Sequence, residues 1–523
     1  MERVSEHWPN RYGNGYYAWK EVDQNGRKSF ERLRSSPIAL AWANLRLRHV
    51  LLMSRTMYDE ETRKRKFVVD LYENEDEVLE DVLQSIVWVE DLYETVDGFD
   101  MHRHAFNVRL KLPDGKYELR FMTVMAHEIS DGLSAFNWFN DFIRILNLSN
   151  RDLEEEIRTC RQVGEIRKRL PPAQEDFYPT DKGNKARERW FWAIIRVLRH
   201  LRKITSPSFT NPLRRKERLA ETASFLPVFE KIFDYSESSK PPMNSGHVAA
   251  TLSLQASKRM TDICRSMRIS IGAGCFALAG LAMMAIHEER YPHIPDDQRL
   301  PFVASFLSTR GFFGLNTPAD SCMLAFSEGI VMPFLPSYLP IEGRFKLTAS
   351  HANRELCMYQ KRTKGKPAGM LGPFSPHDPA RLLANAYLSS IERSDSRLSE
   401  EMKFGVDPQG ELQPPAYQSG ATCGVSSIGF TGQWLAAGKY DLNEVGGGVG
   451  KKDFVADFRS LRQGVRARED EFLVGSSSDA EGRVHFSVSY DENAISPEMA
   501  GRWRDVIEGL MEGGGKLDEK AKL

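Results

Sequence analysis

A strand–turn–helix unit is predicted around one stretch of the sequence, Met125-Ala-His127-Glu128-Ile129-Ser130-Asp131-Gly132-Leu133. Alternating residues over 117–126 precede it and predict a strand. The residues that follow it predict a helix that begins just past Asp131 and buries one face. Its apolar residues recur at helical spacing at Leu133, Phe136, Phe139, Ile143 and Leu146.

Three residues of this stretch have side chains suited to chemistry. Histidine suits a general base because an imidazole gains and loses a proton near neutral pH. A strand end would fix the backbone of His127, and Gly132 would keep a channel beside it free of a side chain. Asp131 would cap the helix or pair with a distant arginine. A lone histidine at a strand end more often has a structural role, so the functional interpretation depends on the combined His-x-x-x-Asp-Gly pattern.

His127, Asp131 and Gly132 match the HxxxDG motif, and the chain resembles the coenzyme-A-dependent acyltransferase superfamily along nearly its whole length. That superfamily includes chloramphenicol acetyltransferase, plant BAHD acyltransferases and peptide-synthetase condensation domains. Within it, the chain looks most like fungal trichothecene 15-O-acetyltransferases and related secondary-metabolite acetyltransferases. The residues that carry this finer likeness are Trp8-Pro-Asn, Gly15-Tyr-Tyr-Ala-Trp19 and Arg34-Ser-Ser-Pro-Ile-Ala-Leu-Ala-Trp42.

The resemblance implies an α/β fold of two similar chloramphenicol-acetyltransferase-like domains around a central tunnel, with His127 as the catalytic base. It implies acetyl-CoA, or another acyl-CoA, as co-substrate rather than a permanently bound cofactor. The acceptor would be a small hydroxylated metabolite of the fungal secondary or mycotoxin type. Asp131 would turn away from the substrate and pair with an arginine, and Arg310 lies where that partner is expected. The alternative for Arg310 is a solvated strand end.

The Asp-Phe-Gly-Trp-Gly string of BAHD enzymes is missing from this chain. The segment Ser426-Ser427-Ile428-Gly429-Phe430-Thr431-Gly432 looks like the shorter Ser/Gly form of fungal and yeast alcohol acyltransferases. A hydroxyl of Ser426, Ser427 or Thr431 would then line the tunnel or donate to an oxyanion. The alternative is that these residues only end a strand.

The order of the expected elements predicts an N-terminal domain over 1–204, a crossover linker over 205–246 and a C-terminal domain over 247–523. Prolines and charged clusters punctuate the linker. Helices are expected over 37–52, 77–89, 186–204 and 496–511, with two more after the first strand of the second half. Strands are expected in the hairpin 105–112/117–126 and over 247–254, 302–307, 421–430, 454–461, 471–475 and 483–490.

Composition limits the class of protein. A length of 523 residues needs at least two large domains, and 71 basic against 72 acidic side chains give no electrostatic reason to expect a nucleic-acid partner. Six scattered cysteines form no zinc or disulfide pattern and fit a reducing compartment. The uncharged run from Ile269 to Ile286 predicts a buried helix rather than a membrane span because it is rich in glycine and alanine.

Several further interpretations follow. We expect no metal: His127-Glu128 begins like a zinc-protease motif, but position 131 is Asp. The polar N-terminus predicts no signal peptide, and a cytoplasmic monomer is expected, although the final Ala521-Lys-Leu523 leaves a peroxisomal address open. A glycine-rich loop over 446–452 is expected to be surface rather than a phosphate cradle. Two alternative functions remain, a condensation-type enzyme that uses a carrier-protein thioester and a catalytically silent ligand-binding member.

Overall fold

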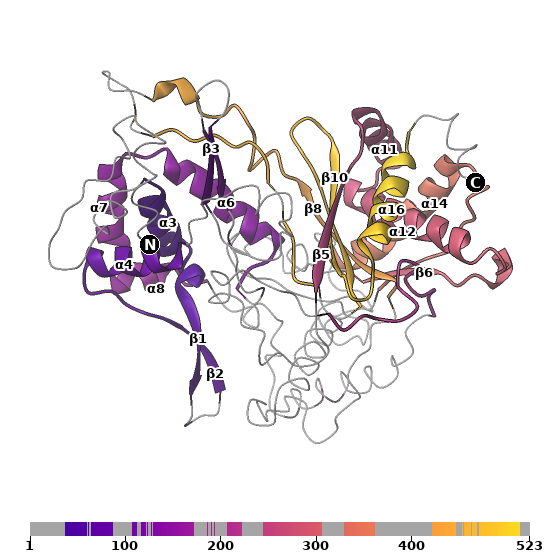
Figure 1. The fold of residues 1–523 in the computed structure, drawn as a ribbon, viewed down its shortest axis with the longest axis horizontal. Coiled ribbons are helices and arrows are strands. Elements are labelled where there is room, and N and C mark those ends of the chain that lie inside the picture. Colours follow the sequence, from indigo (N-terminus) through magenta and orange to yellow (C-terminus); the bar gives the residue numbers. More distant parts are fainter. Residues whose placement is uncertain are drawn as a thin grey trace.

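A computed structural model shows how the chain folds (Figure 1). The part of the chain that it describes comprises residues 37–59, 61, 64–86, 107–111, 117–121, 123, 127, 129–171, 186, 190, 193, 207–221, 244–305, 329–360, 421–445, 452, 454–461, 463–467 and 470–512. Within these residues the protein is a mixed α/β structure, as the sequence predicts.

The second half of the chain is built on a six-stranded mixed sheet with the order β5-β10-β9-β8-β6-β7. β10 pairs antiparallel with β5 and β9, β8 pairs parallel with β9 and β6, and β6 pairs antiparallel with β7. The strands are β5 (Ser245–Thr251), β6 (Phe302–Ser305), β7 (Ile330–Met332), β8 (Cys423–Phe430), β9 (Phe472–Ser478) and β10 (Val484–Asp491). Five of the strands expected from the sequence are therefore confirmed.

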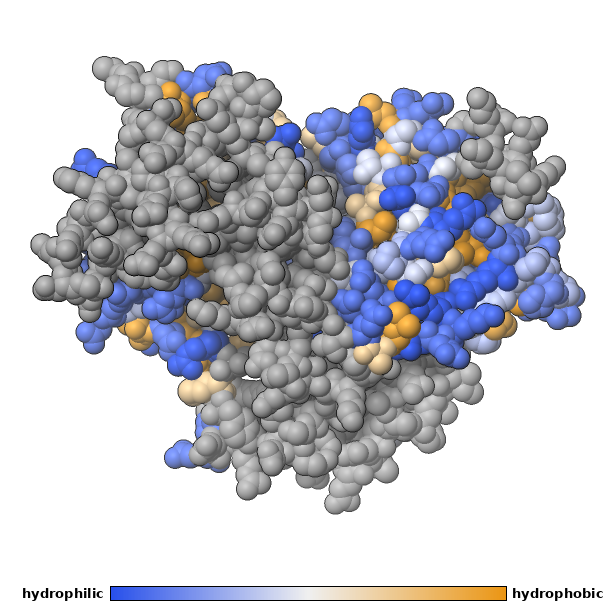
Figure 2. Space-filling model, in the orientation of Figure 1, coloured by the Kyte–Doolittle hydropathy of each residue, from blue (hydrophilic) through white to orange (hydrophobic). Residues whose placement is uncertain are grey.

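Four helices cover one face of this sheet (Figure 1). They are α11 (Leu254–Ser266), α12 (Ile271–Arg290), α14 (Ile341–Gln360) and α16 (Pro497–Gly509). α12 packs deepest, and Gly274 allows it to approach α11 because a Cβ there would lie 2.7 Å from Cys264 Sγ. Figure 2 shows that the outer surface of this helical layer is mostly hydrophilic, as expected for helices whose apolar sides face the sheet.

α12 is long and apolar enough to cross a membrane, judged by length and composition alone. In the structure most of its residues are buried between the sheet and the neighbouring helices. Ser270 caps its N-terminus by accepting a hydrogen bond from Ala273 N at 3.2 Å. The prediction of a buried helix over 269–286 is confirmed, with bounds shifted toward the C-terminus.

The first half of the chain combines helices with two short hairpins. The helices are α3 (Pro37–Arg48), the 3-10 turn η1 (Val50–Met53), α4 (Glu75–Ser85), α6 (Gly132–Leu146), α7 (Asn150–Cys160) and α8 (Val163–Arg169). The antiparallel hairpins are β1 (Ser54–Asp59) with β2 (Lys64–Val69), and β3 (Asn107–Lys111) with β4 (Tyr117–Phe121). The predicted hairpin and the first two predicted helices are confirmed, although α4 begins two residues earlier than expected.

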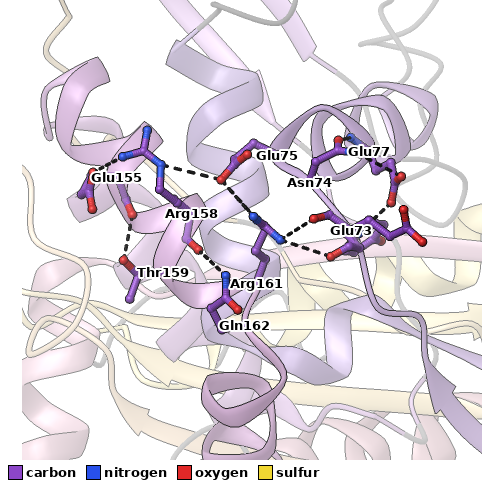
Figure 3. Close-up of polar contacts among 10 residues, drawn as sticks. Glu73, Asn74, Glu75, Glu77, Glu155, Arg158, Thr159, Arg161 and Gln162 are labelled. Atoms are coloured by element: carbon purple, nitrogen blue, oxygen red, sulfur yellow. Dashed lines mark hydrogen bonds and ion pairs between the residues drawn. The ribbon is translucent and has the colours of Figure 1, made fainter.

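Aromatic side chains join these elements into a second core. Phe121 of β4 stacks on Phe142 of α6 with ring centroids 4.4 Å apart, and Trp42 of α3 meets Phe121 edge-on at 5.5 Å. α4 and α7 are tied at the surface by Arg161, which donates to Glu75 at 3.2 Å and to Glu73 O at 2.8 Å (Figure 3). α6 packs against this core through Phe142, Ile145 and Leu146.

Residues 207–221, inside the stretch predicted to be a linker, pack against the C-terminal half. Phe209 and Leu213 belong to its hydrophobic core. Arg215 N donates to Ala494 O at 2.7 Å, and Arg218 pairs with the fully buried Asp491 at 2.9 Å. Arg214 and Arg215 are half-buried, and Arg214 also donates to Asp470 O. The domain boundaries themselves stay predictions.

Candidate active site

His127 lies on a turn between β4 and α6, and its side chain is exposed. Its Nδ1 lies 2.7 Å from the carbonyl oxygen of Ser130. A carbonyl oxygen can only accept, so Nδ1 carries the hydrogen of this bond. In the neutral ring the lone pair is then at Nε2. This is the tautomer that a general base needs.

Asp131 caps α6 and shapes the turn that carries His127. Its carboxylate accepts from Ser134 N at 2.9 Å, and its own backbone N donates to Ser134 Oγ at 2.7 Å, which together form a capping box. The capping role expected for Asp131 is confirmed. Arg310, the predicted ion-pair partner, lies outside the described residues, so that pairing stays a prediction.

Gly132 is the point at which α6 meets the C-terminal half of the chain. A Cβ at this position would lie 3.2 Å from Ile428 Cδ1 of β8 and 3.8 Å from Nε2 of Gln463. Contacts of 3.2 Å are tighter than nearly all real Cβ contacts, so glycine lets the two halves close on each other here. The sequence motif therefore sits at the junction between the halves.

α6 continues this junction along its length. Gly132, Phe136, Asn140, Ile143 and Asn147 recur every three or four residues and so lie on one side of the helix. Phe136 lies 6.2 Å from Trp434 between ring centroids. Asn147 donates to Ala456 O at 2.8 Å and accepts from Ala456 N at 3.1 Å.

The core-facing side of α6 is rotated from the one that the sequence suggested. The residues that are fully buried include Ala135, Trp138, Phe142 and Ile145. Of the five residues expected on the buried face, Phe136 and Leu146 are buried, whereas Leu133, Phe139 and Ile143 are only half-buried. The helix thus serves two interfaces, one with its own core and one with the C-terminal half.

A small pocket lies on this second interface, about two turns along α6 from Gly132. Its walls are Asn140 and Ile143 of α6 and the residues Trp434, Leu435, Ala436, Lys439, Tyr440, Asp457 and Phe458 of the C-terminal half. Asp457 fixes one wall because its carboxylate accepts hydrogen bonds from the backbone N atoms of Gly438, Lys439 and Tyr440.

The three hydroxyl residues predicted near the oxyanion differ in their surroundings. Thr431 is buried, and its hydroxyl donates to Ser478 O at 2.9 Å, so its only hydrogen is committed to the backbone. Ser427 faces the helical layer, since its Oγ lies 3.3 Å from the position of a Cβ on Gly272 of α12. Ser426 lies on the opposite face because successive side chains of a strand alternate.

That opposite face is the one without the four helices. In Figure 1 the helices α11, α12, α14 and α16 lie on one side of β8, β10 and β5, and α6 lies on the other side. Ile428 of β8 reaches Gly132 of α6, which shows that this part of the strand lies next to the turn of His127. Of the three candidates, Ser426 is therefore the one on the site's side of the sheet.

Residues that the sequence analysis singled out elsewhere contribute little to this site. Among the described residues no three of His, Cys, Asp and Glu gather as a metal site. The five cysteines in the described ranges are free thiols, and burial raises the pKa of Cys264 to about 11. The glycine-rich loop over 446–451 lies outside the described residues, while Lys452 pairs with Glu444 at 3.1 Å.

Ile428 and Gln463 were not predicted as neighbours of the motif. No linear signal marks them, because they approach Gly132 from segments about 300 positions away along the chain. The Asn147–Ala456 pairing was missed for the same reason. Only the contiguous part of the site is visible in the sequence.

No protein-family model matches this chain, and no curated protein matches it in sequence. Among solved structures, the chain is similar to the trichothecene 15-O-acetyltransferase of Fusarium sporotrichioides, with a TM-score of 0.58, 11% identity, and 92% of this chain and 86% of that chain covered. The SgcC5 protein of Streptomyces globisporus has a TM-score of 0.45 at 11% identity, with 91% and 88% covered.

A condensation domain from the Monacolin K polyketide synthase MokA has a TM-score of 0.44 at 10% identity, with 94% of this chain and 89% of that chain covered. Identities this low show a common fold and nothing finer, and only the first likeness is close enough to support an argument. The chain therefore has the two-domain α/β fold of the chloramphenicol acetyltransferase type, which it shares with the Fusarium trichothecene acetyltransferase.

Proposed function

We propose that this protein is an acyl-CoA-dependent O-acyltransferase that moves an acetyl group from acetyl-CoA to a hydroxyl of a small metabolite. The observation that carries the proposal is the hydrogen bond from His127 Nδ1 to Ser130 O at 2.7 Å. It leaves the lone pair of the neutral ring at Nε2, on an exposed side chain at the junction of the two halves.

In the proposed reaction, Nε2 of His127 takes the proton of the acceptor hydroxyl while its oxygen attacks the thioester carbonyl carbon. The C–O bond forms, the carbonyl becomes an oxyanion, and the C–S bond then breaks. The departing thiolate receives the proton from the imidazolium. No acyl-enzyme is needed, so much of the rate would come from holding both substrates together.

Two features of the fold support this assignment. Asp131 and Ser134 hold the turn through a capping box, which fixes the orientation of the ring. The fold is shared with the trichothecene 15-O-acetyltransferase of Fusarium sporotrichioides. A fungal secondary metabolite or mycotoxin intermediate is accordingly the proposed acceptor class.

The test is release of free coenzyme A thiol from acetyl-CoA in the presence of a panel of hydroxylated fungal metabolites. A parallel series presents the acetyl group on a pantetheine-loaded carrier protein. Acceptor-dependent thiol release from acetyl-CoA supports the proposal. Turnover only with the carrier would replace it with a condensation-type function, and ligand binding without turnover from either donor would indicate a silent member.

A further inference from the structure

Gln463 presents an amide at the junction between the halves. Its Nε2 lies 3.8 Å from the position that a Cβ on Gly132 would take. Only two side-chain carbons of Ile428 lie nearer to that position, among the atoms outside the immediate chain neighbours. The side chain is half-buried. In the part of the chain that the structure describes, no residue hydrogen-bonds its carboxamide, although an amide offers two donors and an acceptor. A polar group in this state is suited to bind a ligand.

The backbone at Gln463 is firmly held. Ser487 of β10 donates its hydroxyl hydrogen to Gln463 O. Because that hydrogen is used, His247 Nε2 donates to Ser487 Oγ, at 2.7 Å. Two residues further on, Val465 N donates to Ser489 Oγ at 3.0 Å.

These bonds place the segment on the sheet face that lies opposite the helical layer. Ser487 and Ser489 alternate with Val488, whose side chain belongs to the helix-covered core. Gln463 lies outside the strands, but these hydrogen bonds hold its segment against β10, which is the condition for a preorganised donor.

We propose that the Gln463 amide donates a hydrogen bond to the oxyanion that forms on the thioester carbonyl. The inference rests on the proposed acyl transfer at His127. Thr431 has no hydrogen to give, and Ser427 faces α12, so two of the three hydroxyl candidates cannot perform this role in this arrangement. Apolar Ile428 beside the amide limits competing water, which strengthens a hydrogen bond to developing charge.

The test compares Gln463→Leu, which keeps a similar size and removes the donor, with wild type over a range of acetyl-CoA concentrations up to saturation. Loss of an oxyanion donor is expected to lower kcat by roughly 10²–10³-fold while KM for acetyl-CoA changes little. Gln255→Leu on the exposed side of α11 is the matched control and should retain wild-type kcat. Thermal unfolding of both variants checks that folding is intact.

Three outcomes separate the two proposals. A wild-type rate that depends on His127 together with a slow Gln463→Leu supports both. The same His127 dependence with an unchanged kcat in Gln463→Leu overturns the role of Gln463 and leaves the acyltransferase standing. A wild type without any His127-dependent turnover overturns the proposed function and, with it, this inference.

Discussion

His287 makes stability depend on pH in a way that can be worked out from its surroundings. It lies on α12 and is only 5% exposed. Its ring packs against Phe209, with centroids 4.6 Å apart, and against Tyr291 at 5.0 Å. Its Nδ1 lies 2.9 Å from the guanidinium of Arg299, which can only donate, so the imidazole accepts. Burial, reinforced by the positive charge of Arg299, lowers the pKa of His287 from 6.5 to about 4.

The sign of the effect follows from proton linkage. Between about pH 4 and pH 6.5 the unfolded chain binds a proton at this histidine and the folded chain does not. Stability contributed by the neutral ring is therefore complete above pH 6.5 and is lost as the pH falls toward 4. At about 1.4 kcal/mol per pKa unit, the difference between 6.5 and about 4 corresponds to about 3 kcal/mol.

The perturbation is His287→Gln, which removes the titrating ring and keeps an acceptor for Arg299. The assay is urea unfolding followed by tryptophan fluorescence at several pH values from 7 to 4.5. We expect the variant to be less stable at pH 7, because it loses ring packing, but to lose less further stability than wild type as the pH falls. His293→Gln, at an exposed position, is the control and should follow wild type. Parallel losses in wild type and His287→Gln would show that His287 does not cause this pH dependence.

Three further predictions concern a packing contact, a pair of hydrogen bonds and an ion pair. Gly132→Val should lower kcat/KM by up to about 100-fold, and by more than Gly132→Ala, because its branched side chain must displace Ile428, which lies 3.2 Å from the Cβ position. Equal rates of the two variants would contradict this. Asn147→Ala should cost about 1–3 kcal/mol in chemical unfolding by leaving the backbone of Ala456 unpaired. Asp491→Ala should cost about 3–5 kcal/mol, since it leaves Arg218 without its buried partner, and a thermal scan that matches wild type would refute it.

Local periodicity was enough to predict much of the fold. The apolar spacing after Asp131 marks α6, and the alternation over 421–430 marks β8. Sheet order was not accessible, because β8 pairs with β6 and β9, which lie far apart along the chain. Short elements with few buried residues also escaped prediction. α7 buries only Leu153, Ile157 and Cys160, so its apolar signal is weak against its many charges.

One predicted strand is wrong. Residues 454–461 alternate as a strand would, but no strand forms there. The backbone of Ala456 instead pairs with the side-chain amide of Asn147, which offers a donor and an acceptor much as a neighbouring strand would. The alternation reflects this packing, because Phe454 and Ala456, two residues apart, both pack against the hydrophobic core that includes α6.

Only part of the candidate site could be predicted from the sequence. His127, Asp131 and Gly132 are contiguous, and their spacing alone suggested a base, a cap and an open position. Their contacts with Ile428 and Gln463 depend on how the two halves meet, which no local pattern encodes. The choice of Ser426 over Ser427 needed the strand's orientation, which a Ser-Ser pair in a sequence does not reveal.

In the proposed reaction, His127 is the base for acyl transfer. The most direct measurement is the rate of acetylated product formation from acetyl-CoA by wild type and His127→Ala, with His293→Ala as an exposed-histidine control and acetyl-CoA binding measured for each. We predict a fall of roughly 10²–10⁴-fold in kcat for His127→Ala with binding of acetyl-CoA retained. A wild-type rate in a folded His127→Ala protein would contradict the account.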